Sequence, residues 1–305
     1  MGKKPESNSQ KKIIIITIFR WIFVMICIFT TILLLTLHPY LIDQIPASVL
    51  NPEYNRSVII VESPQKSSSI ILEDQQELFR FNEPPVQGNE HFFEKLVNIQ
   101  TQDCYIASPI QIDLKDPPAV ILYSHGSETR VTKDMAEQFM KDLRMYGSNF
   151  TEQNYIFAAS NQHGENKGDP IATQDTIALY EYIKKHYYIS DSVYLIGYSM
   201  GARVTMNYAL ERPDDIISIA LLAPAEYPSR FDAQMVKTLS HINFKIWHGD
   251  KDVHVPLIAS NLLIERFDSM GKEIEIEILK DADHWEVDVD LREKVLDYFN
   301  ENISN

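Results

Sequence analysis

Ser199 lies where its hydroxyl could act as a nucleophile. It is the centre of Gly-Tyr-Ser-Met-Gly at 197–201, which follows an apolar run over 192–196 and precedes a helical pattern that extends to about residue 211. Such an abrupt passage from strand to helix needs strained dihedrals at the corner, and the two glycines leave the room for them. The helix start behind the serine favours negative charge. The pattern predicts a nucleophile elbow, with a chance Gly-x-Ser-x-Gly in a loop as the alternative.

Two other side chains suit the groups that a nucleophilic serine requires. A hydroxyl is a weak nucleophile at neutral pH and needs a base within hydrogen-bonding distance. Histidine has a suitable pKa, and a carboxylate must hold its ring in the right tautomer and stabilise the imidazolium. Asp252 lies in the polar segment 248–256, and His284 lies in Asp-Ala-Asp-His-Trp at 281–285. Both segments follow predicted strands, so these groups are candidates for the acid and the base.

Alternating strands and helices from about residue 94 must position these groups. Several strands, such as 119–123 and 216–222, are apolar on both faces, which indicates a parallel sheet covered by helices on both sides. Functional groups should then gather at the carboxyl ends of the strands. The predicted fold class is α/β, with a mostly parallel eight-stranded sheet. The predicted strands are 95–100, 103–108, 119–124, 154–159, 192–197, 216–222, 243–248 and 274–279, and the predicted helices are 131–146, 171–186, 200–211, 256–269 and 289–300.

From residue 94 to about 300 the chain resembles the α/β-hydrolase superfamily. The resemblance depends on four features in that family's order: Gly-x-Ser-x-Gly at 197–201, His-Gly at 125–126 after an earlier strand, His-Gly-x-x-Asp-x-x-Val-Pro at 248–256, and Asp-His at 283–284 before the last helix. It implies that Ser199 is the nucleophile, Asp252 the acid and His284 the base of a serine hydrolase. It also implies an oxyanion hole formed by the backbone N–H groups of Met200 and Ser127, each such donor being worth roughly 3 kcal/mol.

Other residues compete for the acid and base roles. Asp250 is the alternative acid, but only Asp252 fits the Gly-x-x-Asp-x-x-Val-Pro pattern of the family. His163 follows another predicted strand and is the main alternative base, ahead of His254, which lies close to Asp252 in sequence. The oxyanion loop reads His-Gly-Ser-Glu-Thr and lacks the consecutive glycines of many lipases and esterases. The assignment of Ser127 is therefore less direct than that of Met200.

The segment that would carry a lid over the site is short. About 19 residues, 223–241, separate the sixth predicted strand from the seventh, which leaves room for one short helix and a loop. We therefore expect a compact lid and an open site. The predicted substrate-contacting residues are Tyr198, His163 and Trp285, with Tyr227 and Phe231 as further aromatic walls. No cluster of Arg or Lys in the sequence marks an anionic substrate.

The first 93 residues form three segments that differ in composition. Residues 1–12 are basic, residues 13–37 are almost wholly apolar, and residues 38–93 are a proline-punctuated tether and N-terminal extension. As a helix, the apolar segment would be about 37 Å long, enough to cross a bilayer core of about 30 Å. The basic flank predicts a single-pass anchor with a cytoplasmic N-terminus and the catalytic domain, 94–305, on the opposite side. A cleaved signal peptide is the alternative, although its apolar region would be shorter.

Charge and cysteine content exclude several classes of protein. The net charge is −15 although the first twenty residues are net positive, so the rest of the chain is more acidic still and nucleic acid is not expected as a partner. The two cysteines, Cys27 and Cys104, form no disulfide framework. No residue spacing matches a zinc site, and we expect no metal and no cofactor.

Three functions are consistent with these patterns. The first is a membrane-anchored serine hydrolase that cleaves carboxylic esters or thioesters, and an apolar site beside a membrane suggests lipid-like substrates or acylated proteins. The second keeps the same three side chains but acts as an acyltransferase or a peptidase. The third is a relative of the same fold that binds a ligand or partner without catalysis.

Overall fold

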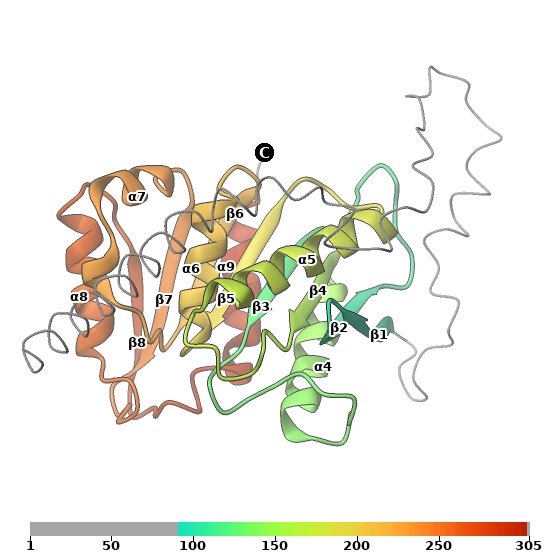
Figure 1. Cartoon of the computed structure of the whole chain (residues 1–305), viewed down its shortest axis with the longest axis horizontal. Coiled ribbons are helices and arrows are strands. Elements are labelled where there is room, and N and C mark those ends of the chain that lie inside the picture. Colours follow the sequence, from blue (N-terminus) through green and yellow to red (C-terminus); the bar gives the residue numbers. More distant parts are fainter. Residues whose placement is uncertain (1–90, 304–305) are drawn as a thin grey trace, which may run out of the picture. The chain divides into compact units, whose positions relative to one another are not determined.

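The computed structural model describes residues 91–303, which form one eight-stranded sheet with helices on both faces (Figure 1). The strand order is β1-β2-β4-β3-β5-β6-β7-β8. β1 and β2 are antiparallel to their neighbours, whereas the pairs from β4 to β8 are parallel. The strands are β1 (Phe92–Ile99), β2 (Gln102–Pro109), β3 (Ala119–Ser124), β4 (Tyr155–Ser160), β5 (Val193–Tyr198), β6 (Ile216–Leu222), β7 (Asn243–Gly249) and β8 (Glu275–Leu279).

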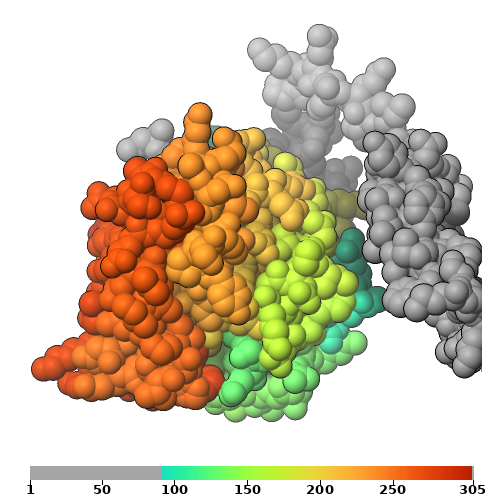
Figure 2. Space-filling model, turned by 60° about the vertical axis from the view of Figure 1, so that its left-hand side comes forward, coloured from blue at the N-terminus to red at the C-terminus, as the bar shows by residue number. Residues whose placement is uncertain are grey.

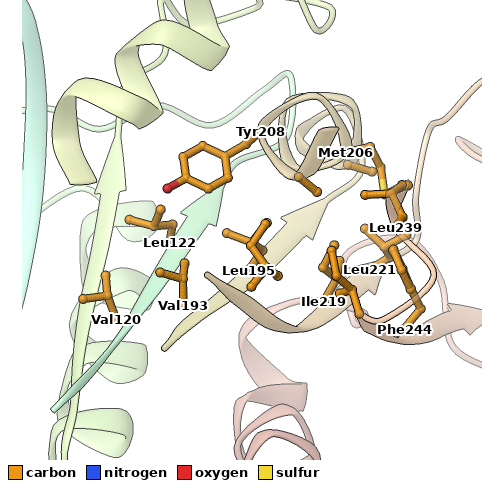
Figure 3. Packing of buried hydrophobic residues seen from close by; sticks show 14 of the residues in the cluster. Val120, Leu122, Val193, Leu195, Met206, Tyr208, Ile219, Leu221, Leu239 and Phe244 are labelled. Carbon is orange, nitrogen blue, oxygen red and sulfur yellow. The ribbon is translucent and has the colours of Figure 1, made fainter. Parts of the chain in front are cut away.

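Alternation along the central strands sends side chains into a core on each face of the sheet. On one face, Val120, Leu122, Leu195 and Ile219 belong to the same buried cluster as Met206 and Tyr208 of α6 (Figure 3). This face is covered by α5 (Pro170–His186), α6 (Gly201–Glu211), α7 (Ala233–Thr238) and α8 (Ile258–Asp268), and the other by α4 (Gln138–Thr151), η3 (Val289–Leu291) and α9 (Arg292–Glu301). Strands that are buried on both faces must be apolar at nearly every position, as the sequence predicted.

The predicted fold class and all eight predicted strands agree with this structure to within a few residues, β1 beginning at Phe92 rather than 95. The largest error concerns α4, which was predicted over 131–146 and begins at Gln138. The preceding residues form a loop because side chains there bind nearby backbone N–H groups: the Thr132 hydroxyl accepts from Asp134, and the Asp134 carboxylate accepts from Ala136. Such local hydrogen bonds compete with helix formation.

The connection between β6 and β7 is short. It contains a 3₁₀ helix, η2 (Pro228–Arg230), and the six-residue helix α7. Segments far apart in the sequence, including this connection, α8 and the region around α5, form one continuous surface of the molecule (Figure 2).

The predicted tail, apolar anchor and most of the tether, residues 1–90, lie outside the described residues. Within 91–303, no helix has the length and apolar content needed to span a bilayer.

The parallel strands bring the candidate residues to one edge of the sheet. Ser199 follows β5, His125 follows β3, Asp252 follows β7, and His284 follows β8. β3 and β5 are adjacent and parallel, but the chain continues from them to opposite sides of the sheet. The strand after β3, β4, lies on its outer side, and the strand after β5, β6, lies on the other side. Ligands of α/β sheets bind at such switch points.

Candidate active site

Ser199 occupies a strained corner between β5 and α6. Its φ is +51°, in the left-handed region that residues with a Cβ rarely adopt. Its backbone N–H donates to Leu222 O at 2.8 Å, and its carbonyl accepts from Ala225 N–H at 2.9 Å. A Cβ on Gly201 would lie 2.0 Å from Ser124 O, so only glycine allows α6 to begin this close to β3. The corner is thus held by hydrogen bonds to the neighbouring strand end.

The side chains of Ser199, His284 and Asp252 form one hydrogen-bonded chain. The Ser199 Oγ lies 2.9 Å from His284 Nε2, and the His284 Nδ1 lies 2.7 Å from Asp252 Oδ2. All three residues are buried. Since the carboxylate can only accept, Nδ1 carries the proton, and Nε2 is left to accept from the serine hydroxyl. The structure therefore brings together the three residues that the sequence proposed, with the imidazole in the tautomer of a general base.

The Asp252 carboxylate is fixed by its own loop. Oδ1 accepts from the backbone N–H groups of His254 and Val255, at 2.9 and 2.8 Å, which leaves Oδ2 for His284. Asp250, the alternative acid, instead accepts from the backbone N–H of Asp281 and is exposed. Only Asp252 therefore contacts the imidazole.

His248 stabilises the loop that carries Asp252. Its Nε2 lies 2.7 Å from Val255 O, and its Nδ1 lies 2.7 Å from the Ser260 Oγ. Because a carbonyl only accepts, Nε2 carries the proton and Nδ1 accepts from the hydroxyl. Burial lowers the pKa of His248, which keeps the ring neutral. This histidine ties the end of β7 to α8, as a core residue would.

The loop after β3 places Ser127 beside the nucleophile. The Gly126 carbonyl accepts from the Thr129 N–H and hydroxyl, at 3.4 and 3.2 Å, and lies 2.7 Å from His125 Nδ1. The peptide is trans, so the Ser127 N–H points in the direction opposite to this carbonyl. His125 is buried, which lowers its pKa, and its Nε2 lies 2.9 Å from Asn161 O. The ring therefore joins the loops that follow β3 and β4.

A shallow pocket of about 450 Å³ opens onto these groups. Met200 and Ser127 both line it, so the two predicted oxyanion donors lie in the same hollow as Ser199. Of the predicted substrate-contacting residues, Trp285 lines the pocket and is 47% exposed. The lining residues are Ser127, Glu128, Glu165, Lys167, Ser199, Met200, Arg203, Ala225, Tyr227, His254, Val255, His284 and Trp285.

The other predicted wall residues require correction. Tyr198 is 2% exposed, because strand alternation points it into the core with Ile196; its hydroxyl donates to His284 O at 3.2 Å. Tyr198 therefore contacts the backbone of His284 from the core side and does not line the pocket. Phe231 is also buried, with its ring 4.9 Å from that of Phe267. Tyr227 does line the pocket, as expected.

His163 was also wrongly expected to contact substrate. Its Nδ1 lies 2.6 Å from Asp175 Oδ2, and its Nε2 lies 3.3 Å from the side-chain nitrogen of Gln102. It does not line the pocket. The turn at 161–164 holds it there, since Gln162 and His163 both have positive φ and Gln162 is buried with its amide bonded to Ser124 and Thr176.

Charged residues that the sequence reasoning missed also line the pocket. Arg203 and Lys167 are 36 residues apart, so no local cluster revealed that they share one wall. Glu128 and Glu165 lie in the same hollow. For Arg203 the available signal was its closeness in sequence, four residues after Ser199. The sequence has no cluster of Arg or Lys that marks an anionic substrate, yet two cationic side chains line this pocket.

A buried carboxylate lies behind the loop of His284. Asp288 accepts from the Tyr123 hydroxyl at 2.9 Å and from the Tyr146 hydroxyl at 3.0 Å. Burial raises the pKa of Asp288 to about 7, and these two hydrogen bonds oppose the rise. The loop between β8 and α9 is thereby tied to β3 and α4. Among residues 91–303, no group of three His, Cys, Asp or Glu side chains is arranged to hold a metal ion.

Comparison with solved structures identifies the fold. Est1E from Butyrivibrio proteoclasticus is 17% identical, with a TM-score of 0.52 over 70% of this chain and 99% of that one. An esterase from Pyrococcus furiosus is 15% identical, with a TM-score of 0.53 over 73% and 98%. The acylaminoacyl peptidase of Pyrococcus horikoshii is 15% identical, with a TM-score of 0.53 over 70% of this chain and 41% of that one. At these identities the likeness concerns the fold alone.

No curated protein matches the chain in sequence. A family model does match it, described as an alpha/beta hydrolase domain, over residues 117–294. This range is more than half of the chain and contains Ser199, Asp252 and His284. The protein is thus a member of the α/β-hydrolase family.

Proposed function

We propose that this protein is a serine hydrolase that cleaves carboxylic esters or thioesters through an acyl-enzyme. The observation that carries the proposal is the unbroken chain of hydrogen bonds from Ser199 through His284 to Asp252, at 2.9 and 2.7 Å, at the floor of an open pocket. A binding protein of the same fold would have no need for a serine hydroxyl aligned on a neutral imidazole.

The reaction would proceed in two halves. Ser199 Oγ attacks the carbonyl carbon while its proton moves to His284 Nε2, and Asp252 stabilises the resulting imidazolium. The carbonyl oxygen becomes an oxyanion that accepts from the N–H groups of Met200 and Ser127. His284 then donates the proton to the leaving alcohol or thiol, which leaves an acyl group on Ser199. Water attacks this ester with His284 as base, and the carboxylic acid departs.

Replacement of the nucleophile is the primary test. S199A should lower kcat for a short 4-nitrophenyl ester by about 10⁴-fold or more, because no other group can form the acyl-enzyme. It should also abolish labelling by a fluorophosphonate probe. The matched control is S269A, which removes an exposed hydroxyl at the end of α8. Retention of half the activity in S199A would end the proposal.

A substrate panel would separate the proposed hydrolysis from its alternatives. Esters of increasing chain length, lysolipids and thioesters test for lipid-like substrates, and peptides test for peptidase activity. An added alcohol acceptor tests for acyl transfer, since a transferase would form a new ester faster than free acid. A chain that labels with the probe but turns over only peptides would favour the peptidase.

We also propose that residues 13–37 anchor the enzyme in a membrane, with residues 1–12 in the cytoplasm and the catalytic domain across the bilayer. The length and almost wholly apolar character of the segment support this location. Full-length protein should stay with the membrane pellet during alkaline carbonate extraction, and the catalytic domain should resist protease added from the cytoplasmic side. Release of full-length protein to the supernatant would contradict the anchor.

A further inference from the structure

Arg203 carries a positive charge into the active-site pocket. It lies four residues after Ser199, near the start of α6, and it lines the same hollow as Ser199 and Trp285. The catalytic steps proposed above do not use it. A charged side chain so close to the reacting serine can contact any substrate group that extends a few bonds beyond the ester.

The guanidinium of Arg203 is held in place before any ligand binds. Its Nε donates to Ala225 O at 2.6 Å, and its Nη1 donates to Lys167 O at 3.2 Å. The Tyr227 ring stacks beneath it, with 4.0 Å from Cζ to the ring centroid. A cation fixed in this way loses little conformational entropy on binding, which favours affinity and a defined orientation.

The charge of Arg203 is not neutralised within the described part of the chain. No Asp or Glu oxygen lies within 4.0 Å of its guanidinium among residues 91–303. Glu226, the acidic residue next to Ala225, is occupied by Arg230 through two bonds of 2.8 Å. A guanidinium has five N–H donors, so donors remain after the two bonds to carbonyl groups.

The other charges of the pocket restrict which anion fits. Lys167 and Glu165 pair at 3.6 Å and offset each other. Glu128, next to Ser127 in the loop after β3, also lines the pocket. A doubly charged phosphate would be repelled by these two carboxylates more than a singly charged carboxylate. A carboxylate also matches the planar fork of a guanidinium.

We propose that Arg203 is a specificity-determining residue that binds a free carboxylate on the substrate while the ester carbonyl lies at Ser199. The preferred substrates are then esters that carry a second, ionised carboxyl group, such as monoesters of dicarboxylic acids. This inference rests on the proposed hydrolase function and names a substrate class for the same site.

The test compares two esters of equal length that differ in one charge. One is 4-nitrophenyl hydrogen adipate, and the other has its terminal carboxyl capped as the N-methyl amide. Wild-type enzyme should show a kcat/KM about tenfold higher for the anionic ester, as a partly solvated charge-assisted hydrogen bond provides. The glutarate and suberate analogues measure how far from the ester the carboxylate must lie.

The R203M variant should lose the preference for the anionic ester, because its KM for that ester should rise. Its kcat/KM ratio for the two esters should fall to about one, because the pair with the carboxylate is gone. R203K should retain part of the preference, since lysine keeps the charge but lacks the planar fork. If R203M lowers the rates for both esters by the same factor, or leaves the ratio unchanged, Arg203 is only a structural clamp and the proposal is overturned.

R266M is the matched control. The Arg266 guanidinium also donates to a backbone carbonyl, that of Phe231, but it lines a separate hollow between η2 and α8. R266M should keep the wild-type ratio between the two esters. A fall in the ratio for this variant would assign the preference to overall charge and contradict the role of Arg203.

A binding experiment separates failure of this inference from failure of the proposed function. Full-length S199A should bind monomethyl adipate, an anionic ester, more tightly than the same ester with its free carboxyl capped as the N-methyl amide, and the added R203M change should abolish the difference. Calorimetric titration detects this whether or not the chain is a hydrolase. Equal binding of the two compounds by S199A would overturn the proposal even if the wild-type enzyme cleaves esters.

Discussion

Two Asp–His pairs lie at the carboxyl edge of the sheet, and they are nearly identical in geometry. His284 Nδ1 lies 2.7 Å from Asp252, and His163 Nδ1 lies 2.6 Å from Asp175. In both pairs the carboxylate is buried and accepts from Nδ1, so the proton of the neutral ring lies on Nδ1. The pairs differ in the group that meets Nε2. For His284 that group is the Ser199 hydroxyl, whereas for His163 it is the amide nitrogen of Gln102.

The orientation of the Gln102 amide decides what His163 can do. The Gln102 Oε1 accepts from the backbone N–H of His163 at 2.9 Å and from the side-chain amide of Asn161 at 3.2 Å. The Gln102 side-chain nitrogen is therefore the group that faces the His163 ring. A nitrogen donor opposite Nε2 takes up the only free lone pair of the imidazole. His163 therefore has the pairing of a catalytic base without the capacity to act as one. Under the proposed function, the third partner makes one Asp–His pair a catalytic base and leaves the other a structural contact.

The largest contrast should come from removal of each ring. H284A should lower kcat for a short 4-nitrophenyl ester by about 10⁵-fold or more, because the serine then has no base. H163A should keep activity within about threefold, since its ring lies outside the pocket, and should lower the melting temperature by a few degrees. Steady-state kinetics and thermal unfolding measure both. A hundredfold loss of activity in H163A would remove the distinction between the two pairs.

The carboxylates should show a smaller contrast in the same direction. D252N should lower kcat by about 10⁴-fold, because an amide holds the wrong tautomer of His284 and cannot stabilise the imidazolium. D175N should leave kcat near the wild-type value. The pH–rate profile of the remaining D252N activity adds a check, since loss of the carboxylate should weaken the base and shift the profile. Equal losses in both variants would contradict the assignment.

The smallest effect concerns Asp288, a buried carboxyl group in the same loop as His284. Its carboxyl group has an ordinary pKa of 3.8, and burial raises the folded value to about 7. The folded protein therefore binds this proton more tightly than the unfolded chain, and the contribution to stability decreases as pH rises through that window. From pH 5 to 8, wild-type stability should decrease by about 2 kcal/mol relative to D288N, measured by urea unfolding.

A control for Asp288 is D290N, which removes an exposed carboxylate two residues away. Its stability should follow the wild-type pH dependence closely, because this variant keeps the buried Asp288 carboxyl group. If D288N showed the same pH dependence as the wild type, the buried carboxyl would already be ionised at pH 5. The Asp288 carboxyl would then be ionised over the whole range from pH 5 to 8, and the expected pH dependence would be wrong.

The pattern of apolar runs and turn residues was sufficient to predict the sheet. The central strands were placed because strands of a parallel sheet that are buried on both faces must be apolar at nearly every position, which is a local property of the sequence. The start of α4 was missed because the Asp134 and Thr132 side chains bind backbone groups that a helix would otherwise use. The face that a residue occupies was harder to predict, as Tyr198 shows. Its place at the end of β5 suggested the pocket, but its side chain points to the same face of the strand as Ile196 and is buried.

The sequence by itself determined the order and identity of the candidate groups: a serine between two spaced glycines, then an aspartate and a histidine, each after a predicted strand. These follow from short-range constraints, since an elbow needs its glycines and a strand its apolar run. Only the tertiary structure decided that His284 rather than His163 meets Ser199, and that Arg203 and Lys167 share a wall of the pocket. Both depend on loops from different strands meeting at one edge, and contacts between distant segments leave no periodic trace in the sequence.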